Sequence, residues 1–162
     1  DVLMDAISLI AKEIPVFVLL TGPSRGYVIK RLKEMNVPHA HYYVDDYEEM
    51  VRYYRALDLY LMTSREEGGP LCIPESMATG IPIVATDAGM APDMIRNGEN
   101  GFMARSEDFE TLANHVLSVH EDAALRDSLI REAAKTVQEY DWFDISMRYY
   151  KEVYSPLLDT LG

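Results

Sequence analysis

Short apolar runs alternate with longer amphipathic stretches through the first two thirds of the chain. Runs such as VFVLLTG and IPIVAT have no polar face and end near Gly or Pro, which is typical of buried strands. Between the runs, apolar residues recur at three- and four-residue spacing, as in helices that cover a sheet. The pattern predicts strands at residues 16–22, 39–44, 57–63, 81–86 and 101–104.

Helices are predicted between these strands, and three more follow the last strand, at about 107–120, 123–139 and 144–160. Ser24 is the expected cap of the helix over 24–35, and Asp45 or Asp46 the cap of the next one. The alternation favours a parallel sheet covered on both faces. We therefore predict the α/β class: one domain over residues 1–162, with a Rossmann-like, doubly wound parallel sheet of about five strands and C-terminal helices.

The composition restricts the kinds of partner and site that this protein can have. The formal net charge is −12, with 15 basic against 27 acidic residues, which argues against a nucleic-acid partner. The single cysteine, Cys72, cannot form an internal disulfide, fits a reducing compartment, and is interpreted as a packed thiol. His39 and His41 have no further ligand at metal-binding spacing, so no metal is expected. No apolar run reaches the roughly 20 residues of a membrane span.

The first residues, DVLMDAISLIAKEIP, place apolar side chains on one helical face without a capping residue before them. Acidic Asp1 and Asp5 stand where a signal peptide would be basic. We expect the chain to begin inside a helix of a longer protein.

The loop EEGGPLCIPE, residues 66–75, brackets seven uncharged residues between Glu67 and Glu75. It follows the strand at 57–63, and ligands of open parallel sheets bind beyond the carboxyl ends of the strands. Its glycines let the backbone approach a ligand, and the next helix directs its free N–H groups at a phosphate. Ionised carboxylates only accept hydrogen bonds, so they suit hydroxyls on either side. A nucleotide-sugar has this layout; the alternative is an ordinary surface loop.

Residues 64–89, SREEGGPLCIPESMATGIPIVATDAG, resemble the donor-binding half of retaining GT-B glycosyltransferases of the family 4 group. That pattern has two glutamates separated by seven residues, then Gly-x-Pro, a β-run and a glycine loop. Here the matching residues are Glu67, Glu75, Gly80, Pro82 and Gly89. Further similar segments are TGPS (21–24), ALDLYLMTS (56–64), NGENGFMA (97–104) and YDWFDISMRYYKEVY (140–154).

The resemblance implies a role for each matching residue. Glu75 would bind the ribose hydroxyls of the donor, and Glu67, the implied catalytic residue, would hold the transferred sugar near the reacting carbon. The backbone between them would line the sugar and the diphosphate: Gly68, Gly69, Pro70, Leu71 and Cys72, with N–H donors at 69, 71 and 72. Base contacts are implied at Tyr43 and Val44. No cofactor and no metal are implied; the donor is a nucleotide-diphosphate sugar.

The implied function is donor binding in a retaining hexosyltransferase with an unknown acceptor. In the family, an Arg, a Lys and an acceptor-binding domain precede this region, so we expect the isolated chain to be inactive; Arg25 or Arg65 could add charge. A cytoplasmic location is implied, and association of the full protein with the inner face of a membrane stays open. Two alternatives remain: a fragment of a sugar-nucleotide epimerase of the same fold, or a non-catalytic Rossmann-like module.

Overall fold

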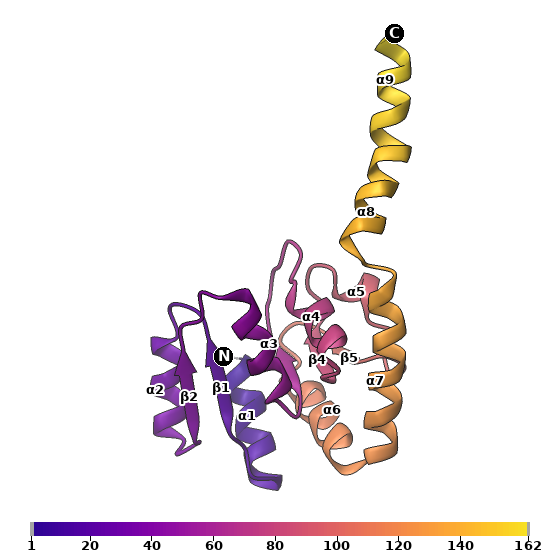
Figure 1. Ribbon diagram of the computed structural model, residues 1–162. Coiled ribbons are helices and arrows are strands. Elements are labelled where there is room, and N and C mark those ends of the chain that lie inside the picture. The colour runs from indigo at the N-terminus through magenta and orange to yellow at the C-terminus, as the bar shows by residue number, and fades with distance from the viewer. Residues whose placement is uncertain (1, 162) are drawn as a thin grey trace.

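The computed structural model describes the backbone of residues 2–161 and the side chains of residues 2–158 (Figure 1). The strands are β1 (Val18–Thr21), β2 (His39–Tyr42), β3 (Tyr60–Met62), β4 (Ile83–Thr86) and β5 (Phe102–Ala104). The helices between them are α1 (Val2–Glu13), α2 (Gly26–Glu34), α3 (Tyr47–Arg55), α4 (Cys72–Thr79) and α5 (Ala91–Met94). The closing helices are α6 (Phe109–Glu121), α7 (Ala123–Gln138), α8 (Trp142–Tyr149), the π-helical turn η1 (Tyr150–Tyr154) and α9 (Ser155–Leu161).

The strands pair only in parallel, which confirms the predicted α/β class. They form two sheets, however, with the orders β1-β2 and β3-β4-β5, whereas the sequence predicted one. A groove of about 1230 Å³ runs between the edges of β1 and β3 and is lined by residues of both strands. The two sheets remain separate because no backbone among the described residues lies in this groove to pair with either edge.

Helix α1 holds the two sheets together through different side chains of one element. Val2, Ala6 and Ile10 pack into the core around β4 and α6. Met4 and Ile7 pack instead with Leu32 of α2 and neighbouring residues of the first sheet. Figure 1 shows α1 between the β1–β2 pair and α6. The fold is thus joined under the groove by apolar packing.

Helices α3 and α4 begin or end at residue types that favour helix termini, but the cap predicted for α2 is wrong. Asp46 caps α3 by accepting a hydrogen bond from the Glu48 amide at 2.8 Å. Gly80 ends α4 in the left-handed conformation, with φ of 76°. Ser24 does not cap α2, so that prediction was wrong: α2 begins at Gly26, after Arg25. Ser24 itself has φ of 60°, which is incompatible with the extended conformation that a capping residue adopts.

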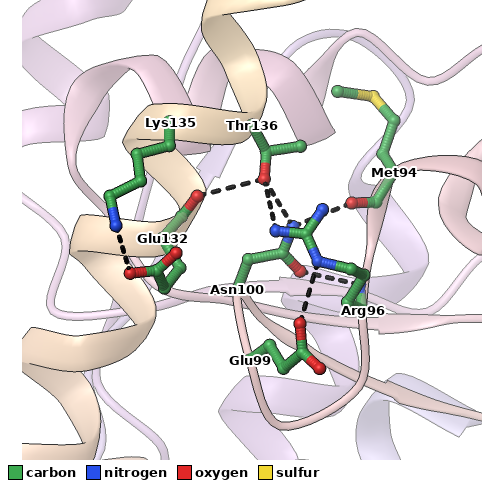
Figure 2. A network of polar contacts seen from close by, with 7 residues as sticks. All are labelled: Met94, Arg96, Glu99, Asn100, Glu132, Lys135 and Thr136. Atoms are coloured by element: carbon green, nitrogen blue, oxygen red, sulfur yellow. Dashed lines mark hydrogen bonds and ion pairs between the residues drawn. The ribbon is translucent and has the colours of Figure 1, made fainter.

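A polar network fixes the segment between α5 and β5 against α7 (Figure 2). Asn100 is only 1% exposed, and its side chain makes three hydrogen bonds. The amide nitrogen donates to the Met94 carbonyl and to Thr136 Oγ1, both at 2.9 Å, and the oxygen accepts from the Arg96 backbone at 2.7 Å. The network therefore anchors the C-terminal end of α5 to α7.

Helices α8 to α9 project from the domain as one arm (Figure 1). The arm carries exposed apolar side chains on several turns: Trp142, Phe143, Met147, Tyr149, Tyr150, Val153, Tyr154, Leu157 and Leu158. Among residues 2–161, no helix has both the length and the apolar character needed to cross a membrane.

Candidate functional site

Two loops form one rim at the carboxyl ends of the adjacent strands β3 and β4. The hydroxyl of Thr86, the last residue of β4, donates to the Ser64 carbonyl in the other loop at 2.6 Å. Gly89 in the second loop lies directly against Glu67 and Pro70 of the first. The two loops therefore hold a fixed position relative to each other before any ligand binds.

Glu67 lies on this rim with its side chain exposed. Its Oε1 accepts a hydrogen bond from the Ser64 hydroxyl at 2.7 Å. This bond uses one acceptor position of the carboxylate and leaves the others open to solvent. Glu67 can therefore accept hydrogen bonds from ligand hydroxyls above the loop.

Glu75 lies in the first turn of α4 and is half-buried. Its two carboxylate oxygens accept hydrogen bonds from two phenols of α3: Tyr47 to Oε1 at 2.7 Å and Tyr54 to Oε2 at 2.8 Å. Burial raises the pKa of Tyr54, with further contributions from Tyr60 and Glu75, so the phenol stays a donor. The carboxylate is thereby held in a defined orientation at the edge of a cavity of about 90 Å³ between β1, α3 and β3.

Cys72, between the two glutamates in the sequence, is a half-buried thiol. Burial raises its pKa most strongly, and the charges of Glu75 and Glu67 raise it further. The raised pKa keeps the thiol protonated near neutral pH. The Cys72 Sγ packs 3.7 Å from Met62 Sδ, which confirms the interpretation of a packed thiol.

Between the two glutamates the backbone is bare. A Cβ at Gly68 or Gly69 would meet no atom within 4 Å. In the part of the chain that the structure describes, the amides of Gly69, Leu71 and Cys72 donate to no other residue. By contrast, the amides of Ile73 and Glu75 are satisfied by Pro70 and Leu71 carbonyls. These unpaired amides are suited to an anion, and their proposed contact with a diphosphate remains a prediction.

The two arginines predicted to supply positive charge, Arg65 and Arg25, have different partners. Arg65 is paired with Glu107, with Nη2 to Oε2 at 3.1 Å as one of two contacts. This pairing lowers the pKa of Glu107 and raises that of Arg65. Arg25 donates from Nε to the Thr21 carbonyl at 2.9 Å, at the carboxyl end of β1. Arg25 belongs to no ion pair among the described residues, so it is the better candidate to supply charge.

The remaining predicted residues follow β2. Tyr43 is exposed and Val44 half-buried, at the carboxyl end of the other sheet. Their proposed contact with a base remains a prediction. Across residues 2–161, no group of three or more His, Cys, Asp or Glu side chains is placed to hold a metal ion. Tyr47 and Tyr54 were not predicted as site residues, and Tyr54 was expected only to pack. Their seven-residue spacing on a helix was the signal that both share a face.

Solved structures show the same architecture. The chain superposes on the C-terminal domain of a group 1 family glycosyl transferase, LpcC, from Francisella tularensis, with a TM-score of 0.74 and 23% identity. That match covers 87% of this chain and 78% of the other. Anabaena HepE, solved in complex with UDP-glucose, gives a TM-score of 0.77 at 23% identity, over 95% of this chain and 44% of HepE. The fold is therefore that of a Rossmann-like half of a GT-B glycosyltransferase.

Residues 1–122 match the family model "Glycosyl transferases group 1". The chain therefore belongs to the group 1 glycosyl transferases. Sulfoquinovosyl transferase SQD2 of Arabidopsis thaliana is 29% identical over 111 residues, which is 67% of this chain and 22% of that protein. The chain thus spans about a fifth of the length of this curated relative.

Proposed function

We propose that this chain is the donor-binding domain of a retaining hexosyltransferase and that its rim binds a nucleotide-diphosphate sugar. The observation that carries the proposal is the loop after β3: Glu67 is held at its start and Glu75 in the first turn of α4, with unpaired amides between them in the chain. Hydroxyls of the ribose are assigned to Glu75, hydroxyls of the sugar to Glu67, and the diphosphate to the amides. Membership of the glycosyl transferase family supports this assignment.

The rim also suits the chemistry of transfer. When the bond between the anomeric carbon and the diphosphate breaks, negative charge grows on the leaving oxygen. Amides at the start of α4 have no acceptor among the described residues, and preorganised donors of this kind stabilise developing charge without rearrangement. Glu67 then acts by holding the sugar in position. The acceptor hydroxyl attacks the anomeric carbon on the face from which the diphosphate departs, so configuration is retained, and its proton passes to an oxygen of the departing diphosphate.

We assign binding of the acceptor, and part of the positive charge that would neutralise the diphosphate, to regions of the full protein outside this chain. Arg65 on the rim is already paired with a carboxylate, whereas Arg25, at the carboxyl end of β1, is not. We expect no sugar transfer by the isolated chain, and transfer by the full-length protein. Turnover by the isolated 162-residue chain would contradict this division of labour. We place the full protein in the cytoplasm, which fits the lone thiol of Cys72.

The test is donor binding by the full-length protein that carries this chain. Thermal shift and calorimetry are measured with UDP, GDP and ADP and their hexose conjugates, because a ligand stabilises the folded state in proportion to its occupancy. Glu75→Gln is expected to weaken nucleotide binding about tenfold or more, since hydrogen bonds to charged groups contribute roughly 1.5–3 kcal/mol. Glu67→Gln is expected to impair sugar transfer more than it weakens binding of the nucleotide alone.

Glu66→Gln is the matched control. Glu66 is the neighbour of Glu67, is exposed, and makes no hydrogen bond or ion pair in the described structure. It removes the same charge from the same loop, so it separates a specific contact from a general electrostatic effect. Equal binding by the Glu75→Gln and Glu66→Gln variants would refute the proposed function.

A further inference from the structure

Two tyrosines of α3 already occupy the carboxylate assigned to the ribose. Tyr47 and Tyr54 are seven residues apart, so two turns of α3 place both phenols on one face. Each donates to a different oxygen of Glu75, at 2.7 and 2.8 Å. A ligand diol that approaches Glu75 therefore meets a carboxylate that has a donor on each oxygen.

The two tyrosines differ in how firmly they are held. Tyr54 is 6% exposed, and its ring packs against Tyr60 with centroids 5.4 Å apart. Tyr47 is 68% exposed at the first position of α3, and its hydroxyl has no other partner in the described structure. Turning Tyr47 outward costs one solvent-exposed hydrogen bond, whereas moving Tyr54 would require opening the core beneath α3.

We propose that Tyr47 is an exchangeable cover of Glu75, displaced by one hydroxyl of the donor's vicinal diol, while Tyr54 stays in place and fixes the carboxylate. This inference rests on the proposed binding of ribose by Glu75. Each carboxylate oxygen has about two acceptor positions, and a tyrosine occupies one on each. One hydroxyl of the diol takes the position that the exposed Tyr47 leaves on Oε1, and the other takes the unused position on Oε2, so the buried Tyr54 keeps its hydrogen bond. In the ligand-free protein, Tyr47 then keeps Glu75 satisfied and correctly turned toward the site.

The two positions should respond to the same chemical change in opposite directions. Tyr47→Phe removes a competitor for Oε1, so the diol no longer has to break a hydrogen bond before it binds. Tyr54→Phe removes the fixed donor to Oε2, so the carboxylate loses its defined orientation. A purely structural pair of tyrosines would not produce opposite signs, because both substitutions delete only a hydroxyl group.

Calorimetry on the full-length protein tests this with UDP as the probe, and GDP and ADP in parallel. We expect Tyr47→Phe to lower the Kd about two- to tenfold, since a net hydrogen bond of this kind is modest, and Tyr54→Phe to raise it. The gain from Tyr47→Phe should be lost with the 2′,3′-dideoxy form of the nucleotide that binds, because it has no diol. Tyr27→Phe is the control: Tyr27 is an exposed tyrosine on α2 with no hydrogen bond among the described residues.

The outcomes separate the two proposals. If Glu75→Gln weakens binding but Tyr47→Phe leaves it unchanged or weakens it, Tyr47 is not a competitor and the inference fails alone. If Tyr47→Phe strengthens binding of the dideoxy nucleotide equally, the effect does not involve the diol and the inference again fails. If Glu75→Gln changes nothing, or none of the three nucleotides binds, the proposed function itself fails and the inference falls with it.

Discussion

Gly89 lies in direct contact with Glu67, across the two loops of the rim. A Cβ at Gly89 would come within 2.8 Å of the Glu67 Cβ and 2.9 Å of its carbonyl oxygen, and Gly89 has φ of 59°. A side chain at residue 89 would therefore be strained and would also push Glu67 out of position. Only a glycine lets the loop after β4 support the loop after β3 at this distance.

We predict that Gly89→Ala destabilises the protein by about 2–4 kcal/mol, because it adds left-handed strain to a backbone clash. Urea denaturation measures this directly. Gly69→Ala is the matched control in the facing loop, where a Cβ meets no atom within 4 Å, and it should change stability by less than about 0.5 kcal/mol. Equal effects at the two glycines would mean that the loops do not pack as described.

Asn100→Ala should be among the more damaging polar substitutions. It would leave the Arg96 amide without its acceptor and the Met94 carbonyl without its donor, and burial of each unsatisfied group costs about 1–3 kcal/mol. We expect a loss of about 3 kcal/mol in the free energy of unfolding. Asn114→Ala, at an exposed position on α6, should leave stability nearly unchanged. A small effect of Asn100→Ala would show that water replaces the amide.

His115 should make stability depend on pH. Its ring stacks on Phe102 with centroids 4.3 Å apart, and burial lowers its pKa from 6.5, against smaller opposing effects of the Met103 backbone and Asp108. The unfolded chain then binds the proton more tightly than the folded one, so stability falls as pH drops from about 6.5 through the lowered pKa. It is regained above that window, where the imidazole is neutral in both states.

His115→Phe keeps the stacked ring and removes the titration. Measured from pH 7.5 to pH 5, the natural protein should lose stability relative to this variant as the pH falls. If the two curves stay parallel, the His115 pKa is the same in the folded and unfolded states, and the proposed linkage is wrong.

The open edges of β1 and β3 predict an alternating pattern of hydrogen exchange. The amides of Val18 and Tyr60 donate within their own sheets, to the Pro38 and Pro82 carbonyls. Successive backbone amides of a strand point toward its two opposite edges. The amides of Leu19 and Leu61 therefore point toward the groove. In the isolated chain we expect Leu19 and Leu61 to exchange much faster than Val18 and Tyr60. Equal protection of all four would mean that some backbone fills the groove.

Much of the fold could be predicted from the sequence because its signals are local. Apolar runs such as IPIVAT identified buried strands, and turn residues such as Gly80 identified helix ends. The separation into two sheets could not be predicted, since an apolar run shows that a strand is buried but does not identify the strand beside it. The cap predicted at Ser24 was wrong because residue type alone suggested it, whereas the backbone angles of Ser24 exclude it.

The site was predictable where its residues are close in sequence. Glu67 and Glu75 bracket one loop, so their common position followed from the loop's place after β3. The partners of Glu75 were not predictable in this way, because Tyr47 lies 28 residues away and its exposed ring resembles many surface tyrosines. The pairing of Arg65 with Glu107, across 42 residues, likewise requires the folded chain.

The bare stretch at residues 68 and 69 has a consequence for how this protein can change over time. Space above these two positions is vacant, so replacement of either residue changes the surface of the loop without disturbing the interior. Gly89 and the glutamates have no such freedom. Under the proposed donor binding, selectivity for the sugar can therefore diversify at two adjacent codons while the scaffold that supports them stays constant.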